Sequence, residues 1–304
     1  MSAVRIVATL ASATLVLAAR EAPYRPATAV ERQARAAVVH ADYRHDDLLW
    51  ENDRTAHRIY GRALEAVEPP SGSGIDAWGK SVAWPFMDRQ LRTGDQHADH
   101  GEGVDFYNVG GGRGAGGLGV WADNKLWVSR NYARYRIASA GPRVADFTVE
   151  YDPWPVGVGR QVRETRRFTL AAGTPFTRIV STIRSPDGAP LIVGIGISRR
   201  ATDPVRDGSF HADPATGRFT WWGPDSASHG AMGVAVLVDP TTIERIGADA
   251  DNRLILIRVR PGRPFVYHIG AAWSRDGRTP DEAAWRREVA TARVDFRVPS
   301  DGVR

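Results

Sequence analysis

The chain is predicted to be all-β, a large antiparallel β-sandwich with few short helices. Its second half contains short runs rich in Val, Ile, Phe, Thr, Trp and Tyr, which Gly, Pro, Asp and Asn separate. The run 176–184 alternates apolar and polar side chains, as a strand with one face in water does. Strands that recur at this spacing favour large antiparallel sheets packed face to face.

The predicted elements follow from these patterns in chain order. A first helix is expected at 27–39, and a second at 279–292, where Thr-Pro-Asp-Glu makes a good helix start. Strands are expected at 143–151, 160–170, 176–184, 190–198, 218–222, 231–238, 253–259 and 264–273.

The first 19 residues are predicted to be a signal peptide. Arg5 precedes an apolar run at 6–19, which is too short to cross a bilayer and ends in small residues. The chain has no cysteine, which excludes a lipid-anchored cysteine and a disulfide framework. We therefore expect a periplasmic or secreted protein without a membrane partner after cleavage. Residues 20–304 are expected to form one β-sandwich domain.

The charge of the chain argues against nucleic acid as a partner. The formal net charge is +5, and no cluster of basic residues is present. A modest positive balance suits a small acidic substrate. Nearly all basic residues are arginine, and Lys80 and Lys125 are the only lysines. A retained lysine is of interest because, unlike arginine, it can lose its proton near neutral pH.

A glycine-rich segment at 110–119 has seven glycines in ten positions. It contains a nominal dinucleotide-binding pattern at 112–117, which we reject because residues 118–128 look like strand and turn, whereas the pattern needs a following helix. We expect a mobile loop that contacts the substrate, with plain β-turns as the alternative.

The residues just before this segment are predicted to be the centre of an active site. Within eleven positions, six side chains can carry or exchange a proton, and two glycines allow tight turns. These six side chains are His97, Asp99, His100, Glu102, Asp105 and Tyr107.

Four segments together resemble a family of secreted bacterial proteins, the domain of unknown function 4861. They are residues 46–61, with Trp-Glu-Asn-Asp-Arg, residues 74–81, residues 97–119, with Asp-His-Gly-Glu-Gly-Val-Asp-Phe-Tyr, and residues 129–132. The resemblance covers nearly the whole mature chain. It implies a supersandwich that is galactose-mutarotase-like and similar to polysaccharide lyase domains. It also implies a role in degrading polysaccharides that contain uronic acid, where lyase or dehydratase activity has been proposed.

The residues provide the groups that uronate β-elimination needs, namely a cation for the carboxylate, a base for the C5 proton and an acid for the leaving oxygen. Arg54 and Arg130 suit the carboxylate, although each could instead form an ion pair within the chain. His100 or Lys80 is the expected base. Tyr107 is the expected acid, with an ordinary core tyrosine as the alternative.

Three other residues complete the predicted substrate site. Asp53 and Glu102 are expected to contact the substrate, and as paired carboxylates they could also serve a hydrolase. Trp78 is expected to stack on a sugar ring, although tryptophan also fills the interior of wide sandwiches. No cofactor is predicted, but a divalent metal is possible. If a metal ion is bound, its candidate ligands are His97, His100, Glu102 and Asp105.

The sequence therefore predicts a carbon–oxygen lyase or dehydratase that acts on an acidic oligosaccharide. The alternatives are a mutarotase or glycoside hydrolase on the same scaffold, or a carbohydrate-binding protein without catalysis. We expect Arg54, Lys80, His100 and Tyr107 to converge on one concave surface, because catalytic groups sit on loops that rigid sheets hold.

Overall fold

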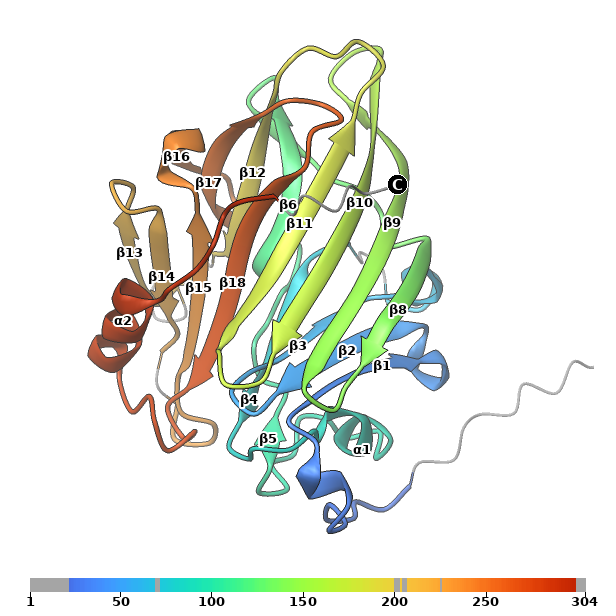
Figure 1. Cartoon of the computed structure of the whole chain (residues 1–304), viewed down its shortest axis with the longest axis vertical. Coiled ribbons are helices and arrows are strands. Elements are labelled where there is room, and N and C mark those ends of the chain that lie inside the picture. Colours follow the sequence, from blue (N-terminus) through green and yellow to red (C-terminus); the bar gives the residue numbers. More distant parts are fainter. Residues whose placement is uncertain (1–21, 69–71, 200–202, 204–206, 225, 299–304) are drawn as a thin grey trace, which may run out of the picture.

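The computed structural model describes residues 22–68, 72–199, 203, 207–224 and 226–298. Within these residues nearly all regular structure is β, in three antiparallel sheets (Figure 1), and the predicted all-β sandwich is confirmed. The predicted signal peptide lies outside the described residues.

The largest sheet has eight strands, in the order β13-β14-β15-β18-β11-β10-β9-β8. Their bounds are β8 (Arg134–Ala140), β9 (Val144–Val156), β10 (Arg160–Ala171), β11 (Phe176–Arg184), β13 (Ser209–Asp213), β14 (Arg218–Trp222), β15 (Met232–Val238) and β18 (Phe265–Trp273).

Two five-stranded sheets form the second layer. One has the order β16-β17-β12-β6-β7, with β6 (Ala115–Ala122), β7 (Lys125–Trp127), β12 (Leu191–Ser198), β16 (Ile243–Ala248) and β17 (Asn252–Val259). The other runs in chain order, with β1 (Ala36–Ala41), β2 (Asp47–Asn52), β3 (Ala56–Ile59), β4 (Ile75–Lys80) and β5 (Gly103–Val104).

One hydrophobic core joins the three sheets. The indole of Trp50 on β2 lies 5.3 Å from the ring of Phe147 on β9 and 5.1 Å from Phe168 on β10. An isolated bridge between Ile75 and Gly114 links the two smaller sheets. The same buried cluster includes side chains from β6, β12, β15, β17 and β18. The N-terminal sheet is thus packed on the sandwich and continues its second layer.

All eight predicted strands are present, with ends within about five residues of the prediction. The strand β10 alternates buried and exposed positions, which is the period-2 pattern of a sheet with one wet face. The strand β11 is buried on both faces over most of its length, because the C-terminal segment covers part of its outer side.

The predicted helix at 27–39 is wrong. A short 3₁₀ turn occupies Glu31–Gln33, and the strand β1 follows it. Val38 pairs with Trp50 of β2, and the amides of Arg35 and Ala36 donate to the carbonyl of Pro142. Pairing with distant strands thus outweighs the weak helix preference of the alanines.

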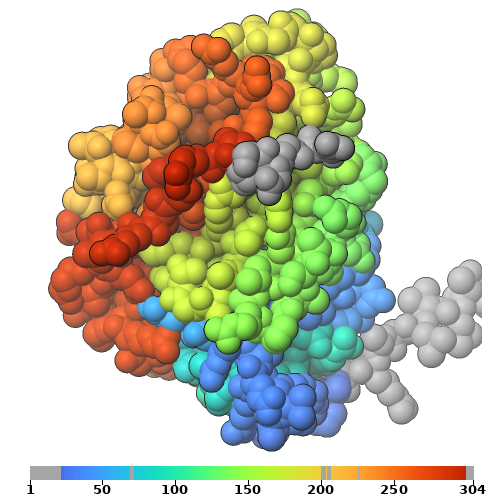
Figure 2. All heavy atoms as spheres, in the orientation of Figure 1, coloured from blue at the N-terminus to red at the C-terminus, as the bar shows by residue number. Residues whose placement is uncertain are grey.

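The predicted C-terminal helix is confirmed as α2 (Glu282–Thr291). The carboxylate of Asp281 accepts the amide of Ala284 at 2.7 Å and caps the helix. Trp285 and Val289 pack against the outer face of the large sheet. Figure 2 shows the red C-terminal segment crossing this face beyond the helix.

A second helix, α1 (Met87–Leu91), is one turn long and was not predicted. The carboxylate of Glu51 accepts the amides of Phe86 and Met87 at 2.8 Å each, so a side chain 35 residues away caps it. No helix in the described part of the chain is long and apolar enough to span a membrane.

The glycine-rich segment is not one loop, contrary to the prediction. Residues 110–114 form turns, but β6 begins at Ala115 and is paired with β12 and β7. A Cβ on Gly116 would lie 2.3 Å from a side-chain carbon of Ile269, and one on Gly119 would lie 2.7 Å from a backbone oxygen. Gly116 therefore allows close packing on β18 of the other layer, and Gly119 allows close approach to β7 in its own sheet.

Candidate functional site

Tyr107 is the predicted catalytic residue that lies in a large cleft. The cleft has a volume of about 660 Å³, within the range of roughly 300–1,000 Å³ that is common for ligand pockets. It is lined by a 3₁₀ turn after β1, by β3 and its end, and by the segment after β5. The lining side chains with polar or aromatic groups are Arg44, Arg58, Tyr60, Glu68, Gln96, His97, Asp105, Phe106, Tyr107 and Asn108.

A neighbouring hollow of about 390 Å³ shares one wall with this cleft. Residues 106–108 line both. On the far side, the ring of His229 stacks on Phe106 at 5.5 Å, and the indole of Trp221 meets Tyr107 edge-on at 5.6 Å. The segment after β5 thus places aromatic rings beside both hollows.

Arg58 is the centre of a buried charge cluster in the floor of the cleft. Its Nη2 donates to Oδ2 of Asp76 at 2.7 Å and to Oδ2 of Asp105 at 2.9 Å, and its Nε donates to Asp76 at 3.1 Å. Its Nη1 lies 3.8 Å from Oδ2 of Asp47. The guanidinium also lies over the rings of Tyr60 and Trp78, at 5.1 and 5.2 Å. Three carboxylates therefore surround one cation.

The environment of this cluster favours protonated acids. Burial raises the pKa of Asp47 to about 7, although Arg58 and Arg44 oppose the shift. Burial and the charge of Asp76 raise the pKa of Asp105 well above its ordinary value. The pKa of Asp76 is also raised by burial, against the effect of Arg58.

His97 lies at the mouth of the cleft in a defined hydrogen-bond arrangement. Its Nδ1 lies 2.7 Å from the carbonyl oxygen of Asp105, which can only accept, so Nδ1 carries the proton. Its Nε2 lies 3.2 Å from the amide nitrogen of Gln96. With the Nδ1 proton directed to this carbonyl, Nε2 is the ring nitrogen that faces the Gln96 amide and can accept a hydrogen bond.

Lys80 and two other predicted residues lie in a different place. Asp53, Arg54 and Lys80 line a hollow of only about 60 Å³. Nζ of Lys80 is buried, lies 2.7 Å from Oε2 of Glu51, and donates to the carbonyl of Trp84. Burial lowers the pKa of Lys80, against the effect of Glu51.

The contacts of Asp53 and Arg54 are also within the protein. Nη2 of Arg54 donates to Glu288 of α2 at 2.6 Å, and Asp53 accepts the amide of Gly173 at 2.7 Å. Arg130 is exposed and forms an ion pair with Glu65. Arg54 and Arg130 therefore each form an ion pair within the chain, which was the stated alternative to binding a substrate carboxylate.

His100 and Glu102 lie near the start of the described chain. The exposed ring of His100 stacks on Tyr24 with centroids 4.4 Å apart. The carboxylate of Glu102 accepts from Tyr24 and Arg89 at 2.5 Å each and from Trp84 at 2.6 Å. Burial opposes ionisation, but these hydrogen bonds prevail and lower the pKa of Glu102.

Trp78 is buried and cannot stack on a sugar in this conformation. Its Nε1 donates to Oδ2 of Asp76 at 3.1 Å, and its ring lies against the Arg58 guanidinium. It supports the charge cluster from behind.

The predicted residues thus divide among separate locations. Arg54 and Lys80 share the small hollow, Tyr107 lies in the cleft, and His100 lines neither of them. The expected convergence of these four residues on one concave surface is therefore not found. Their catalytic and binding roles stay predictions.

The alternative metal site does not form in the described ranges, where no group of three or more His, Asp and Glu side chains is placed to hold a metal ion. The physical reason is that its members belong to different networks. Glu102 is held by Tyr24, Trp84 and Arg89, whereas Asp105 is held by Arg58.

Sequence reasoning did not single out Arg44, Arg58, Tyr60 or Asp76. Arg58 and Tyr60 lie in the 46–61 motif, two residues apart. In a strand such positions share one face, and this period-2 placement was the available clue.

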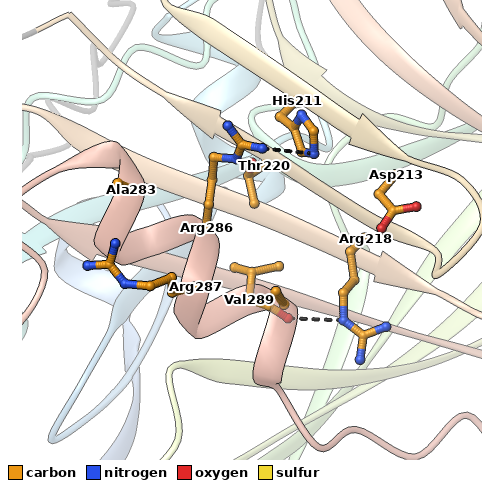
Figure 3. Close-up of a pocket in the computed structure, with 9 residues that line it drawn as sticks. His211, Asp213, Arg218, Thr220, Ala283, Arg286, Arg287 and Val289 are labelled. Atoms are coloured by element: carbon orange, nitrogen blue, oxygen red, sulfur yellow. Dashed lines mark hydrogen bonds between the residues drawn. The ribbon is translucent and has the colours of Figure 1, made fainter.

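A further hollow, of about 350 Å³, lies between α2 and the strands β13 and β14 (Figure 3). Arg286 on the helix points toward His211, with 3.2 Å between Nη2 and Nε2. Nε of Arg218 donates to the carbonyl of Val289 and its Nη2 to that of Ala292, near the helix C-terminus. None of the predicted site residues lines this hollow.

Comparison with known proteins places the chain in a family. An uncharacterized protein, P7, from Formosa agariphila is 28% identical over 264 residues, which cover 81% of this chain and 64% of that protein. The chain thus spans slightly less than two thirds of the length of this relative. The galactosidase domain of an α-galactosidase–sucrose kinase is 10% identical with a TM-score of 0.34, over 78% of this chain and 42% of that one.

The family model described as domain of unknown function (DUF4861) matches residues 3–300, as the motifs predicted. The likeness to polysaccharide lyase and mutarotase-like domains stays a prediction. The chain belongs to the DUF4861 family.

Proposed function

We propose that the chain is a carbohydrate-active enzyme that binds a uronate-containing oligosaccharide in the cleft beside Tyr107 and cleaves it by β-elimination. The observation that carries this proposal is the meeting of Arg44, His97, Asp105 and Tyr107 around one cleft of ligand size. Aromatic rings at Tyr60 and in the neighbouring hollow provide apolar faces for the sugar.

Arg44 would hold the substrate carboxylate. Its Nη2 pairs with Oε1 of Glu68 at 2.8 Å, but its Nη1 has no hydrogen-bond partner among the described residues. Because this Nη1 is buried, a substrate carboxylate would pair with Nη2 in place of Glu68, and a planar guanidinium suits such a partner. Glu68 is more than half exposed, so a ligand can compete for Arg44.

His97 would act as the base and Tyr107 as the acid. Nε2 of His97 takes the C5 proton, and the electrons of the C5–H bond form the C4=C5 double bond. The C4–O bond breaks, and its electron pair stays on the leaving oxygen, which takes the hydroxyl proton of Tyr107. The products are an unsaturated uronate and an alcohol, and solvent then restores the protons.

The experiment incubates the full chain with pectic, ulvan-like and alginate oligosaccharides and follows ultraviolet absorption of the unsaturated uronate. We expect His97→Ala to reduce kcat by roughly 10²-fold or more, the scale for losing a general base. His211→Ala is the matched control, since it removes an exposed imidazole that lines a different hollow, and its activity should be unchanged.

Other results identify the alternatives. New reducing ends without ultraviolet absorption would indicate a hydrolase, in which Asp105 with its raised pKa would be the acid. Exchange of anomers without cleavage would indicate a mutarotase. Saturable binding without turnover would indicate a binding protein. Full activity of His97→Ala on a confirmed substrate would contradict the assigned base.

We further propose a periplasmic or secreted location, since a surrounding polysaccharide is the expected source of substrate. This proposal rests on residues 1–19, which lie outside the described ranges. The N-terminal sequence of the protein recovered from its native host tests it, since an exported protein should have lost these residues.

A further inference from the structure

The buried cluster behind the cleft has more acids than its cation can neutralise. Arg58 is 5% exposed, and Asp47, Asp76 and Asp105 are at most 3% exposed. With every group ionised, three negative charges would face one guanidinium, and burying unpaired charge is costly. The geometry therefore favours a proton on at least one of these carboxyl groups.

The hydrogen bonds identify which acid stays ionised. The carboxylate of Asp76 accepts two bonds from Arg58, one from Trp78 Nε1 and one from the amide of Ala77. Four donors stabilise its negative charge. In contrast, Arg58 Nη2 is the one described donor to the Asp105 carboxyl.

Asp105 is the member of the cluster that reaches the cleft. It lines the cleft wall together with His97 and Tyr107, whereas Asp47 and Asp76 do not. Its backbone carbonyl accepts from His97 Nδ1 at 2.7 Å. One residue thus fixes the orientation of the proposed base through its main chain, and its largely buried side chain belongs to the charge cluster.

We propose that Asp105 is a catalytic residue that stays protonated at neutral pH and donates a hydrogen bond to the substrate carboxylate. Asp76 is a positioning residue whose negative charge helps to keep the proton on Asp105, and Arg58 orients the carboxyl group of Asp105 through its hydrogen bond. This inference rests on the proposed function. Loss of the C5 proton moves negative charge onto the carboxylate, and a preorganised donor stabilises that charge. The proton stays on Asp105 throughout, so no transfer is added to the elimination.

Several charged or titratable groups surround Asp105. They come from the strands β2 to β4 and from the segments beside β2, β3 and β5. Asp47, Arg58 and Asp76 lie on β2, β3 and β4. Outside these strands are Arg44 before β2, Tyr60 just after β3, His97 before β5 and Tyr107 after it. Burial raises the pKa of Asp105, Asp76 adds to this effect, and the two arginines oppose it without reversing it. The pKa of Tyr60 is raised well above its ordinary value, so the phenol stays neutral.

The test compares Asp105→Asn with Asp105→Ala in the full chain. Asparagine keeps a donor of similar shape, so kcat/KM should stay within about tenfold of wild type, whereas alanine should lose roughly 10²–10³-fold. Wild-type kcat/KM should fall as pH rises and Asp105 loses its proton. In Asp105→Asn the part of this fall that Asp105 causes should be absent, because the amide does not titrate, and only the fall from deprotonation of Tyr107 should remain. Asp95→Asn, a change at an exposed aspartate ten residues earlier in the chain, is the control and should keep the wild-type pH profile.

A second measurement separates this inference from the proposed function. The affinity for glucuronate, measured by calorimetry, should fall with rising pH in wild type and stay constant in Asp105→Asn. If glucuronate binds in this way but no oligosaccharide is eliminated, the proposed function fails and the donor role of Asp105 in binding stands. Equal losses in the asparagine and alanine variants, or an alkaline limb at the same pH in wild type and Asp105→Asn, would overturn the inference.

Discussion

At the scale of single residues, the side chain of Arg58 has the most connections in the candidate site. It contacts Asp76 and Asp105 directly and stacks against Trp78 and Tyr60. Its partners come from β4 and from the segment after β5. One guanidinium therefore ties the floor of the cleft to two adjacent strands, and its loss should affect stability as well as activity.

We predict that Arg58→Met lowers the free energy of unfolding by about 3–5 kcal/mol at neutral pH, because it leaves buried carboxylates without their cation. Urea denaturation followed by circular dichroism measures this loss. Arg130→Met is the matched control. It removes an exposed ion pair with Glu65 and should cost at most about 1 kcal/mol. Similar losses in both variants would contradict the assigned role of Arg58.

Asp47 gives a pH dependence of stability with a definite sign. Its pKa is about 7 in the folded chain and about 3.9 in an unfolded one. Between these values the folded state binds more protons, so stability falls as pH rises, by at most about 1.4 kcal/mol per pH unit. In Asp47→Asn this contribution should be absent. Denaturation curves from pH 4 to 8 test it, and parallel wild-type and variant profiles would refute it.

At the scale of elements, α2 covers part of the outer face of the large sheet. Trp285 is fully buried against Phe176, and its Nε1 donates to the carbonyl of Val234 at 3.2 Å. The helix also anchors the loop after β2 through the Arg54–Glu288 ion pair. Its contribution to stability should therefore come mainly from one aromatic side chain.

We predict that Trp285→Ala destabilises the chain by about 3–5 kcal/mol, since it leaves a cavity and removes the indole hydrogen bond to the carbonyl of Val234. Arg286→Ala, the next residue and an exposed one, should change stability by no more than about 0.5 kcal/mol. Denaturation in guanidinium chloride measures both variants. A small effect of Trp285→Ala would mean that the helix is only loosely attached.

At the scale of the whole molecule, the N-terminal sheet and the sandwich share one core. Trp50 of β2 packs on Phe147 and Phe168 and donates to Thr177 Oγ1 at 3.0 Å. The cleft lies where this sheet meets the segment that leads into β6. Relative movement of the two parts would disturb both the core and the site.

We therefore predict a single unfolding transition for the described chain, as expected for one domain. Tryptophan fluorescence and far-ultraviolet circular dichroism should give coincident midpoints in urea. Trp50→Phe should lower both midpoints together. Two separate transitions, one of which involves only the N-terminal sheet, would contradict the single-domain prediction.

The sequence by itself determined the all-β class, the C-terminal helix and the strands from β9 to β18 except β13 and β16. These features depend on local patterns, namely period-2 alternation, turn residues at strand ends and the helix start around Asp281. Family membership was likewise evident from motifs. The sequence also directed attention to residues 97–107, which supply His97, Asp105 and Tyr107 to the cleft.

Only the tertiary structure decided which of these groups meet. Arg58 pairs with acids 18 and 47 positions away, and no local pattern specifies such partners. The same reason explains why Lys80, a conspicuous lysine, is paired with Glu51, and why residues 36–41 form a strand. Strand pairing between distant segments sets both outcomes, because burial and hydrogen bonding with those segments outweigh local preference.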